Sequence, residues 1–153
     1  MSREIVVYKA RRQLEIWENG ARLKAFSVGI GKNALGTKER EGDGRTPEGE
    51  YRIVVKNPKS AFHLSLGLSY PNPADADRGL RAGLITPEEH RAILDAHARG
   101  QRPPWKTALG GEIFLHGNLE KKGTTRGCIS LYDADMTELY ALASLGDRVV
   151  IRE

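Results

Sequence analysis

Two alternating runs on either side of an Asn-Gly pair are the strongest constraint on how this chain folds. Residues 14–18 alternate between apolar and polar, as a half-buried strand does, and Asn19 and Gly20 follow at once. Both residues of an Asn-Gly pair tolerate a positive φ, so the pair predicts a two-residue hairpin turn. Residues 23–28 are then expected to return as the next strand. The chain therefore begins as antiparallel β-structure.

Further strands are predicted along the chain. Residues 5–8 are β-branched or aromatic, Tyr51, Ile53 and Val55 alternate, and residues 113–116 and 148–151 are short apolar runs. The 17 glycines among 153 residues favour a fold rich in loops and tight turns over a helix bundle. That length suits one domain, residues 1–153.

Helix start signals occur mainly in the middle of the chain. Asn72 can cap a short helix, and Thr86 with Glu89 forms a capping box around a proline at the first helical position. The second of these helices is expected to end near Gly100. A last helix is predicted over residues 134–143, capped by Asp133. We therefore expect a mainly β domain with a helical insertion.

Charge and hydropathy exclude several classes of protein. The net charge is only +4, and the basic residues form no long run, so nucleic-acid binding is not expected. No apolar stretch reaches the roughly 18–20 residues that span a bilayer. Residues 5–8 are also too short an apolar run for a secretory signal, which leaves open a cytoplasmic location or a signal that was removed.

A single cysteine, Cys128, follows His116 by 12 residues. A thiol with an ordinary pKa near 8.5 is mostly protonated at neutral pH, and a histidine is a suitable base to activate it. The backbone N–H groups of Arg126, Gly127 and Cys128 are candidates for an oxyanion hole. From residue types alone, a buried, inert thiol and a structural histidine remain open alternatives.

The sequence around these two residues resembles the L,D-transpeptidase catalytic domain family, also called the YkuD-like family. Its signature, a His-Gly element followed by Ser/Thr-His-Gly-Cys, corresponds to residues 116–117 and 125–128. Residues 44–51 resemble the family's Thr-Pro-x-Gly-x-Tyr/Phe strand entry, and residues 146–151 its closing Gly-Asp-x-Val-x-Ile segment. Residues 62–72 are similar to the YafK-like branch. The resemblance covers nearly the whole chain.

This resemblance implies a fold, an L,D-transpeptidase-type β-sandwich with a helical insertion and a short helix after the catalytic loop. It also implies a chemistry, in which Cys128 is the nucleophile, His116 the general base, and the Gly117 carbonyl orients the imidazole. No metal or organic cofactor is implied. The family's second histidine is Arg126 here, which keeps a backbone amide but adds a side chain able to hold a substrate carboxylate.

The implied substrates are peptidoglycan stem peptides, with a wall-anchored lipoprotein as a further partner. The thioester would be resolved by a stem amine, a lipoprotein lysine or water, and the implied location is the cell envelope or periplasm. Arg126, His63, Tyr70 and Asn118 are the candidate substrate-binding residues, although ordinary packing is an open alternative for His63 and Tyr70.

Three further readings stay open. His90 and His97 are expected to be ordinary surface histidines rather than metal ligands, because a zinc site needs three or four ligands. Because Arg126 replaces a family histidine, a catalytically degenerate module that only binds cell-wall peptides is an alternative function. A cysteine hydrolase with a broader substrate range is another.

Overall fold

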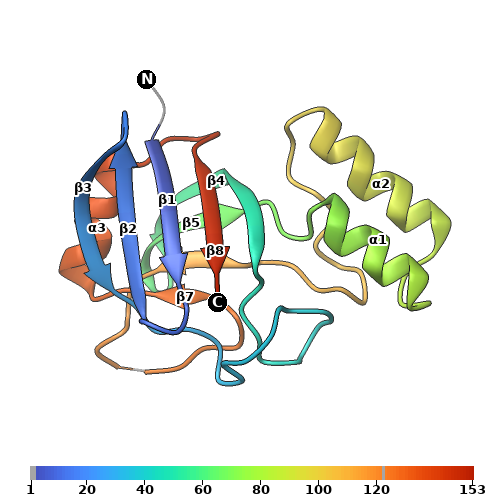
Figure 1. Cartoon of the computed structure of the whole chain (residues 1–153), viewed down its shortest axis with the longest axis horizontal. Coiled ribbons are helices and arrows are strands. Elements are labelled where there is room, and N and C mark those ends of the chain that lie inside the picture. The colour runs from blue at the N-terminus through green and yellow to red at the C-terminus, as the bar shows by residue number, and fades with distance from the viewer. Residues whose placement is uncertain (1–2, 122) are drawn as a thin grey trace.

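The computed structural model describes residues 3–121 and 123–153, which form a mostly β structure with three helices (Figure 1). The strands are β1 (Arg3–Tyr8), β2 (Gln13–Glu18), β3 (Ala21–Ser27), β4 (Gly49–Ser60), β5 (His63–Leu68), β6 (Phe114–His116), β7 (Ile129–Ser130) and β8 (Arg148–Arg152). The helices are α1 (Pro73–Arg81), α2 (Pro87–Ala98) and α3 (Asp133–Leu142).

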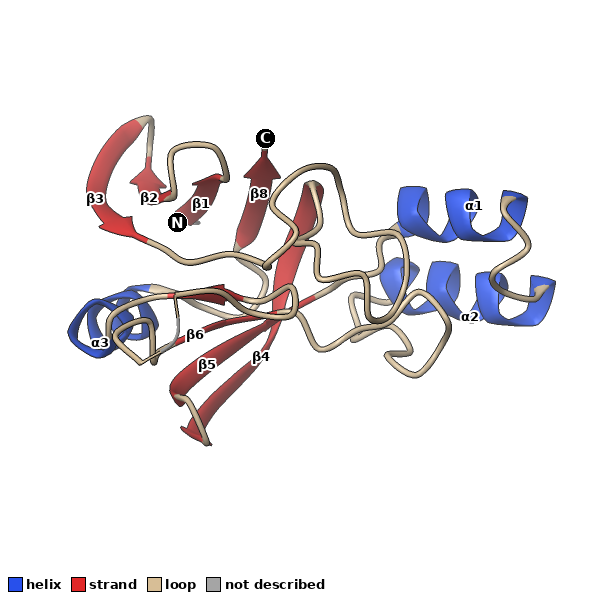
Figure 2. Ribbon diagram, turned by 90° about the horizontal axis from the view of Figure 1, so that it is seen from below, coloured by secondary structure: helices blue, strands red, loops and turns tan. Residues whose placement is uncertain are grey.

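All eight strands belong to one sheet, in the order β3-β2-β1-β8-β4-β5-β6-β7. The long strand β4 joins its two halves, since residues 49–52 pair with β8 and the remainder pairs with β5. Seen from below, the half that contains β1, β2, β3 and β8 lies over the half that contains β5 and β6 (Figure 2). The single sheet thus forms the two facing layers expected of a sandwich, and the mainly β fold class is confirmed.

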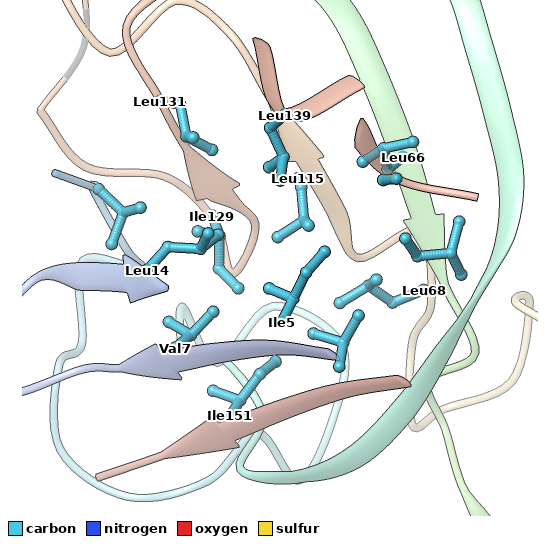
Figure 3. Packing of buried hydrophobic residues seen from close by; sticks show 14 of the residues in the cluster. Ile5, Val7, Leu14, Leu66, Leu68, Leu115, Ile129, Leu131, Leu139 and Ile151 are labelled. Carbon is cyan, nitrogen blue, oxygen red and sulfur yellow. The ribbon is translucent and has the colours of Figure 1, made fainter. Parts of the chain in front are cut away.

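The hydrophobic core fills the space between these two layers (Figure 3). Ile5 and Val7 from β1 point inward, as do Leu66 and Leu68 from β5, and all four are fully buried. Leu139 on α3 extends the same core. Alternation along each strand therefore places the other side chains on the outer faces.

The N-terminal hairpin follows the sequence prediction. Asn19 and Gly20 have φ angles of 51° and 80°, and β2 and β3 pair antiparallel on either side of them. The return strand begins at Ala21, slightly earlier than expected. The local turn chemistry therefore sets the pairing of β2 and β3 next to the turn.

The helical insertion lies to one side of the sheet (Figure 1). Both predicted caps are present: the side chains of Asn72 and Thr86 each accept the backbone N–H of the third helical residue. Helices α1 and α2 share a small core of their own, formed by Ala76, Ile85, Ile93 and Leu109. Tyr51 of β4 donates to the Asp75 carboxylate at 2.8 Å, which ties α1 to the sheet.

The predicted cap of the third helix is wrong. Helix α3 has Tyr132 as its N-cap, without a side-chain cap hydrogen bond, and Asp133 is its first residue. The Asp133 carboxylate instead accepts the backbone N–H of Asn118 at 2.8 Å. This bond connects the helix to the loop that follows β6.

The glycine-rich segment 36–47 is a loop, as expected, and a buried lysine holds it in place. Lys9 is only 2% exposed, and its Nζ donates to the carbonyls of Gly36 and Thr46, each at 2.8 Å. It also pairs with the Glu48 carboxylate at 3.0 Å.

In the described part of the chain, no helix is long and apolar enough to cross a membrane.

Candidate active site

The pairing of two short strands brings His116 and Cys128 together. Strands β6 and β7 run parallel, and His116 pairs with Ser130 while Leu115 pairs with Ile129. Leu115 and Ile129 are buried in the core, so the alternation of side chains places His116 and Ser130 on the opposite face. Cys128 precedes Ser130 by two residues and shares its face.

Both residues line one pocket of about 630 Å³. The remaining described lining residues come from four segments of the chain: Lys32, Phe62, Asn118, Thr124, Thr125, Arg126 and Ser130. The pocket therefore joins the predicted nucleophile and base to loops that are distant in the sequence.

The loop that carries Cys128 is held by Thr125. Its backbone bridges to the segment around Gly31, where its N–H donates to the Ile30 carbonyl at 3.0 Å and its carbonyl accepts the Lys32 N–H at 2.9 Å. Its hydroxyl accepts the Gly127 N–H at 3.0 Å and donates to the Cys128 carbonyl at 2.6 Å. One side chain thus fixes the turn before the thiol.

Glycine is required at position 127 for a steric reason. Its φ is 145°, and a Cβ there would lie 2.7 Å from the Arg45 carbonyl oxygen. Because real Cβ atoms do not approach backbone oxygens that closely, a larger residue would push this loop away from the segment 36–47. The close packing of this loop against the segment 36–47 is therefore enough to explain why position 127 is a glycine.

The orientation of the His116 ring follows from one short contact. Its Nδ1 lies 2.6 Å from the Gly117 carbonyl oxygen, the contact that the family resemblance led us to expect. A carbonyl oxygen only accepts, so Nδ1 carries a hydrogen and the Nε2 of the neutral ring keeps its lone pair. The neutral imidazole is thereby set up as a proton acceptor at Nε2.

The surroundings of His116 also favour the neutral ring. The side chain is 8% exposed, and the Phe62 ring lies over it with 4.9 Å between the ring centroids. This burial lowers the pKa of His116, while the hydrogen bond to Gly117 opposes the shift. The Gly117 N–H donates to the Phe62 carbonyl at 2.9 Å, which holds the aromatic residue beside the histidine.

The thiol of Cys128 rests in its protonated form. Its Sγ accepts the Phe114 N–H at 3.4 Å and donates to the Glu112 carbonyl, also at 3.4 Å. Burial raises the pKa of Cys128 to about 11, although the Phe114 N–H acts in the opposite direction. At neutral pH this thiol therefore needs a base before it can attack.

One of the three predicted oxyanion-hole donors is engaged elsewhere. In this conformation the Gly127 N–H already donates to the Thr125 hydroxyl, and its part in an oxyanion hole stays a prediction. No residue within 3–121 or 123–153 accepts the N–H groups of Arg126 and Cys128. These two amides are the remaining candidates.

The four candidate substrate-binding residues divide into two pairs. Arg126 and Asn118 line the pocket, whereas His63 does not, because its Nε2 lies 2.8 Å from the Thr137 hydroxyl of α3. Tyr70 is fully buried, and its hydroxyl donates to the Leu109 carbonyl at 2.7 Å. Neither His63, which is exposed, nor Tyr70 lines this pocket, and a role for either in substrate binding stays a prediction.

The predicted site residues leave out five residues of the pocket lining: Lys32, Phe62, Thr124, Thr125 and Ser130. Alternation from Cys128 would have placed Ser130 on the same face, and its hydroxyl is buried without a hydrogen-bond partner among the described residues. Lys32 and Phe62 come from distant loops, and no local pattern marks them as pocket residues.

The other histidines have ordinary partners. His90 pairs with the Asp77 carboxylate at 2.7 Å, and the His97 ring contacts the Pro71 carbonyl at the same distance. Within residues 3–121 and 123–153, no group of three or more His, Cys, Asp or Glu side chains is arranged to hold a metal ion. Among its described lining residues the pocket thus presents one thiol and one imidazole.

Comparison with solved structures shows the same fold in several bacterial proteins. The helical cell shape determining protein Pgp2 from Campylobacter jejuni is 21% identical with a TM-score of 0.66, covering 99% of this chain and 48% of that one. Bd1075 from Bdellovibrio bacteriovorus is 24% identical with a TM-score of 0.63, covering 98% and 47%. L,D-transpeptidase 1 from Mycobacterium tuberculosis is 11% identical with a TM-score of 0.56, covering 99% and 62%.

The chain thus spans about half the length of the first two of these proteins. No curated protein sequence matches it. A family model described as the L,D-transpeptidase catalytic domain does match, over residues 2–151. This match covers nearly the whole sequence and confirms the resemblance noted from its motifs: the chain belongs to the L,D-transpeptidase catalytic domain family.

Proposed function

We propose that residues 1–153 form one catalytic domain that transfers acyl groups of peptidoglycan stem peptides through a thioester on Cys128. The observation that carries this proposal is the shared pocket of Cys128 and His116, in which the Gly117 contact leaves the Nε2 lone pair of His116 free. Family membership supports the substrate class.

In the first step the Cys128 Sγ attacks the carbonyl carbon of the L-centre residue of the stem peptide. Since the thiol is protonated at neutral pH, its proton passes to His116 Nε2 as the S–C bond forms. The carbonyl oxygen becomes an oxyanion, which the N–H groups of Arg126 and Cys128 stabilise. His116 is then an imidazolium, with Nδ1 still bonded to Gly117.

In the second step the C–N bond breaks. The imidazolium of His116 gives its Nε2 proton to the departing nitrogen, so a neutral amine leaves and a thioester remains on Cys128. A water molecule or a second amine then attacks the thioester, gives its proton to His116, and the proton returns to Sγ as the C–S bond breaks. Water yields a carboxylic acid, whereas an amine yields a new amide.

Three outcomes are compatible with this sequence of steps. Attack by a second stem amine cross-links two stem peptides, and attack by a lipoprotein lysine attaches that protein to the stem peptide. Attack by water shortens the stem peptide or releases an attached protein. Each outcome takes place in the cell envelope, which is the location we propose for this protein from its family.

Defined muropeptides, with mass spectrometry as the readout, test the proposal. The wild type is expected to release or exchange the terminal D-alanine of a tetrapeptide stem, whereas Cys128→Ala retains the fold and gives no product. The products also show whether the protein cross-links, attaches or trims. Equal product from both proteins would contradict the assignment of Cys128.

A degenerate module that only binds cell-wall peptides is the second candidate. The engaged Gly127 N–H and the arginine at position 126 favour it, because both depart from what the chemistry is expected to use. Saturable binding of the muropeptide to the wild type without any product would support this candidate over the enzyme.

A further inference from the structure

The ammonium group of Lys9 is a charge buried inside the protein. Lys9 follows the last residue of β1, and every hydrogen of its ammonium group has an acceptor. The acceptors are the carbonyls of Gly36 and Thr46, both at 2.8 Å, and the Glu48 carboxylate at 3.0 Å. Burying an ammonium group costs free energy, and a buried ion pair is weak evidence for stability. The presence of this charge therefore needs a reason other than the stability of the fold.

The contacts of Lys9 lie near both ends of one loop. Residues 36–47, which the structure describes throughout, belong to no helix or strand. The shape of such a loop depends on the contacts that hold it, because no ladder of backbone hydrogen bonds runs along it. Since the Lys9 ammonium binds the carbonyls of Gly36 and Thr46 together, it fixes the two ends of the loop relative to each other.

A chain of hydrogen bonds leads from Thr46 to the nucleophile. The Thr46 hydroxyl is fully buried and accepts the Gly31 N–H at 2.9 Å. Gly31 forms a parallel bridge with Thr125. The Thr125 hydroxyl donates to the Cys128 carbonyl at 2.6 Å. The carbonyl that Lys9 holds and the hydroxyl that begins this chain therefore belong to the same residue, Thr46.

Residues 44–46 also pack closely against the backbone on two sides. A Cβ on Gly31 would lie 2.3 Å from the Gly44 carbonyl oxygen. A Cβ on Gly127 would lie 2.7 Å from the Arg45 carbonyl oxygen. Because a close-packed interior transmits displacements instead of absorbing them, a shift of residues 44–46 is expected to move the loop that carries Cys128.

We propose that Lys9 is a positioning residue for the reaction at Cys128. Its ammonium group fixes residues 44–46, and these residues hold the loop that carries the thiol. Lys9 is not among the described residues that line the pocket, so it acts on the geometry of the reaction and not on the binding of substrate. This inference rests on the proposed function and adds to it a residue outside the pocket on which the rate depends.

Lys9→Met tests this inference, because methionine has a long unbranched side chain but no hydrogen to donate. We expect kcat for a tetrapeptide stem to fall about tenfold, since a small displacement of a reacting group has an effect of at least this size. KM should stay near the wild-type value, because no substrate contact is lost. The Gly31 amide should also exchange its hydrogen faster than in the wild type, as measured by NMR.

Lys56→Met is the matched control. The Lys56 ammonium donates to the carbonyls of Tyr140 and Ala143 at 2.9 and 2.8 Å, so the same substitution removes contacts of the same kind away from the loop. We expect this variant to keep the kcat and the Gly31 exchange rate of the wild type. An unchanged kcat in Lys9→Met, or an equal loss of kcat in both variants, would overturn the inference and leave the proposed function intact. A wild type that turns over no tetrapeptide stem would overturn both.

Thr46→Val tests the same connection if Lys9→Met does not fold. Valine keeps the shape of threonine but lacks the hydroxyl that accepts the Gly31 N–H, so kcat should again fall while KM is unchanged. Thr46→Ser keeps a hydroxyl and should restore most of the kcat. A Thr46→Val variant with the kcat of the wild type would overturn the inference, because the contact through which Lys9 acts would then have no effect on the rate.

Discussion

The hydroxyl of Thr125 lies 2.6 Å from the carbonyl oxygen of Cys128 and 3.0 Å from the amide nitrogen of Gly127. The same residue is joined through its backbone to the segment around Gly31. The position of Cys128 in its loop therefore depends on the side chain of Thr125. This arrangement makes Thr125 a positioning residue.

Replacing this hydroxyl is expected to slow acylation. Thr125→Val keeps the shape of the side chain but loses both hydrogen bonds, so the rate of Cys128 acylation by a carbapenem should fall about tenfold. Thr125→Ser keeps the hydroxyl and should restore most of that rate. A Val variant that is acylated as fast as the Ser variant would show that the hydroxyl does not position the thiol.

The pH dependence of kcat/KM should have a broad plateau. The reacting pair is a neutral imidazole and a neutral thiol, so activity falls at low pH only when His116 is protonated, and burial places the pKa of His116 below the ordinary 6.5. At high pH it changes only when the thiol ionises, near its pKa of about 11. If the rate instead rose tenfold per pH unit up to that point, free thiolate would be the nucleophile and His116 would not act as its base.

Removing the Phe62 ring should shift the pH at which kcat/KM falls on the acidic side of the profile. Phe62→Ala exposes the His116 ring to water, so the pKa of His116 is expected to rise toward 6.5 and activity should be lost at a higher pH. An NMR titration of the His116 ring measures the shift directly. Leu35→Ala, at a side chain that is already 79% exposed, should leave the titration unchanged. An identical pKa in Phe62→Ala and the wild type would contradict this account.

The buried hydroxyl of Ser130 is expected to lower stability. Its Oγ has no partner within the described residues, and an unpaired buried hydroxyl costs about 1–3 kcal/mol. Ser130→Ala should therefore raise the free energy of unfolding, measured by urea denaturation. Ser69→Ala is the control, because the Ser69 hydroxyl accepts the Arg52 N–H at 2.9 Å and its loss should be destabilising. A decrease of equal size in both variants would mean that Ser130 is paired.

Features set by neighbouring residues could be predicted from the sequence. The Asn19-Gly20 turn and the capping boxes at Asn72 and Thr86 depend on local geometry alone, and all three are present. The cap predicted at Asp133 is absent because the Asp133 carboxylate instead accepts the N–H of Asn118, a residue 15 positions earlier in the chain. Strand β5 was not predicted either, since its pairing with β4 and β6 joins distant segments.

In the candidate site, too, features within one motif could be predicted, whereas contacts between distant segments could not. The spacing of His116 and Cys128 and their flanking glycines predicted that the two share a site, because those residues lie within one motif, and both line the same pocket. The burial of Tyr70 could not be predicted, because it depends on the contact with Leu109 in the insertion. Lys32 and Phe62 reach the pocket only through the packing of separate loops, which no sequence spacing records.

The central claim is that Cys128 carries the acyl group, and intact-protein mass spectrometry after exposure to a carbapenem tests it most directly. The wild type is expected to gain the mass of one opened β-lactam, and peptide mapping should place it on Cys128. Cys128→Ala, with a circular dichroism spectrum like that of the wild type, should gain none. Equal labelling of the two proteins would contradict the claim.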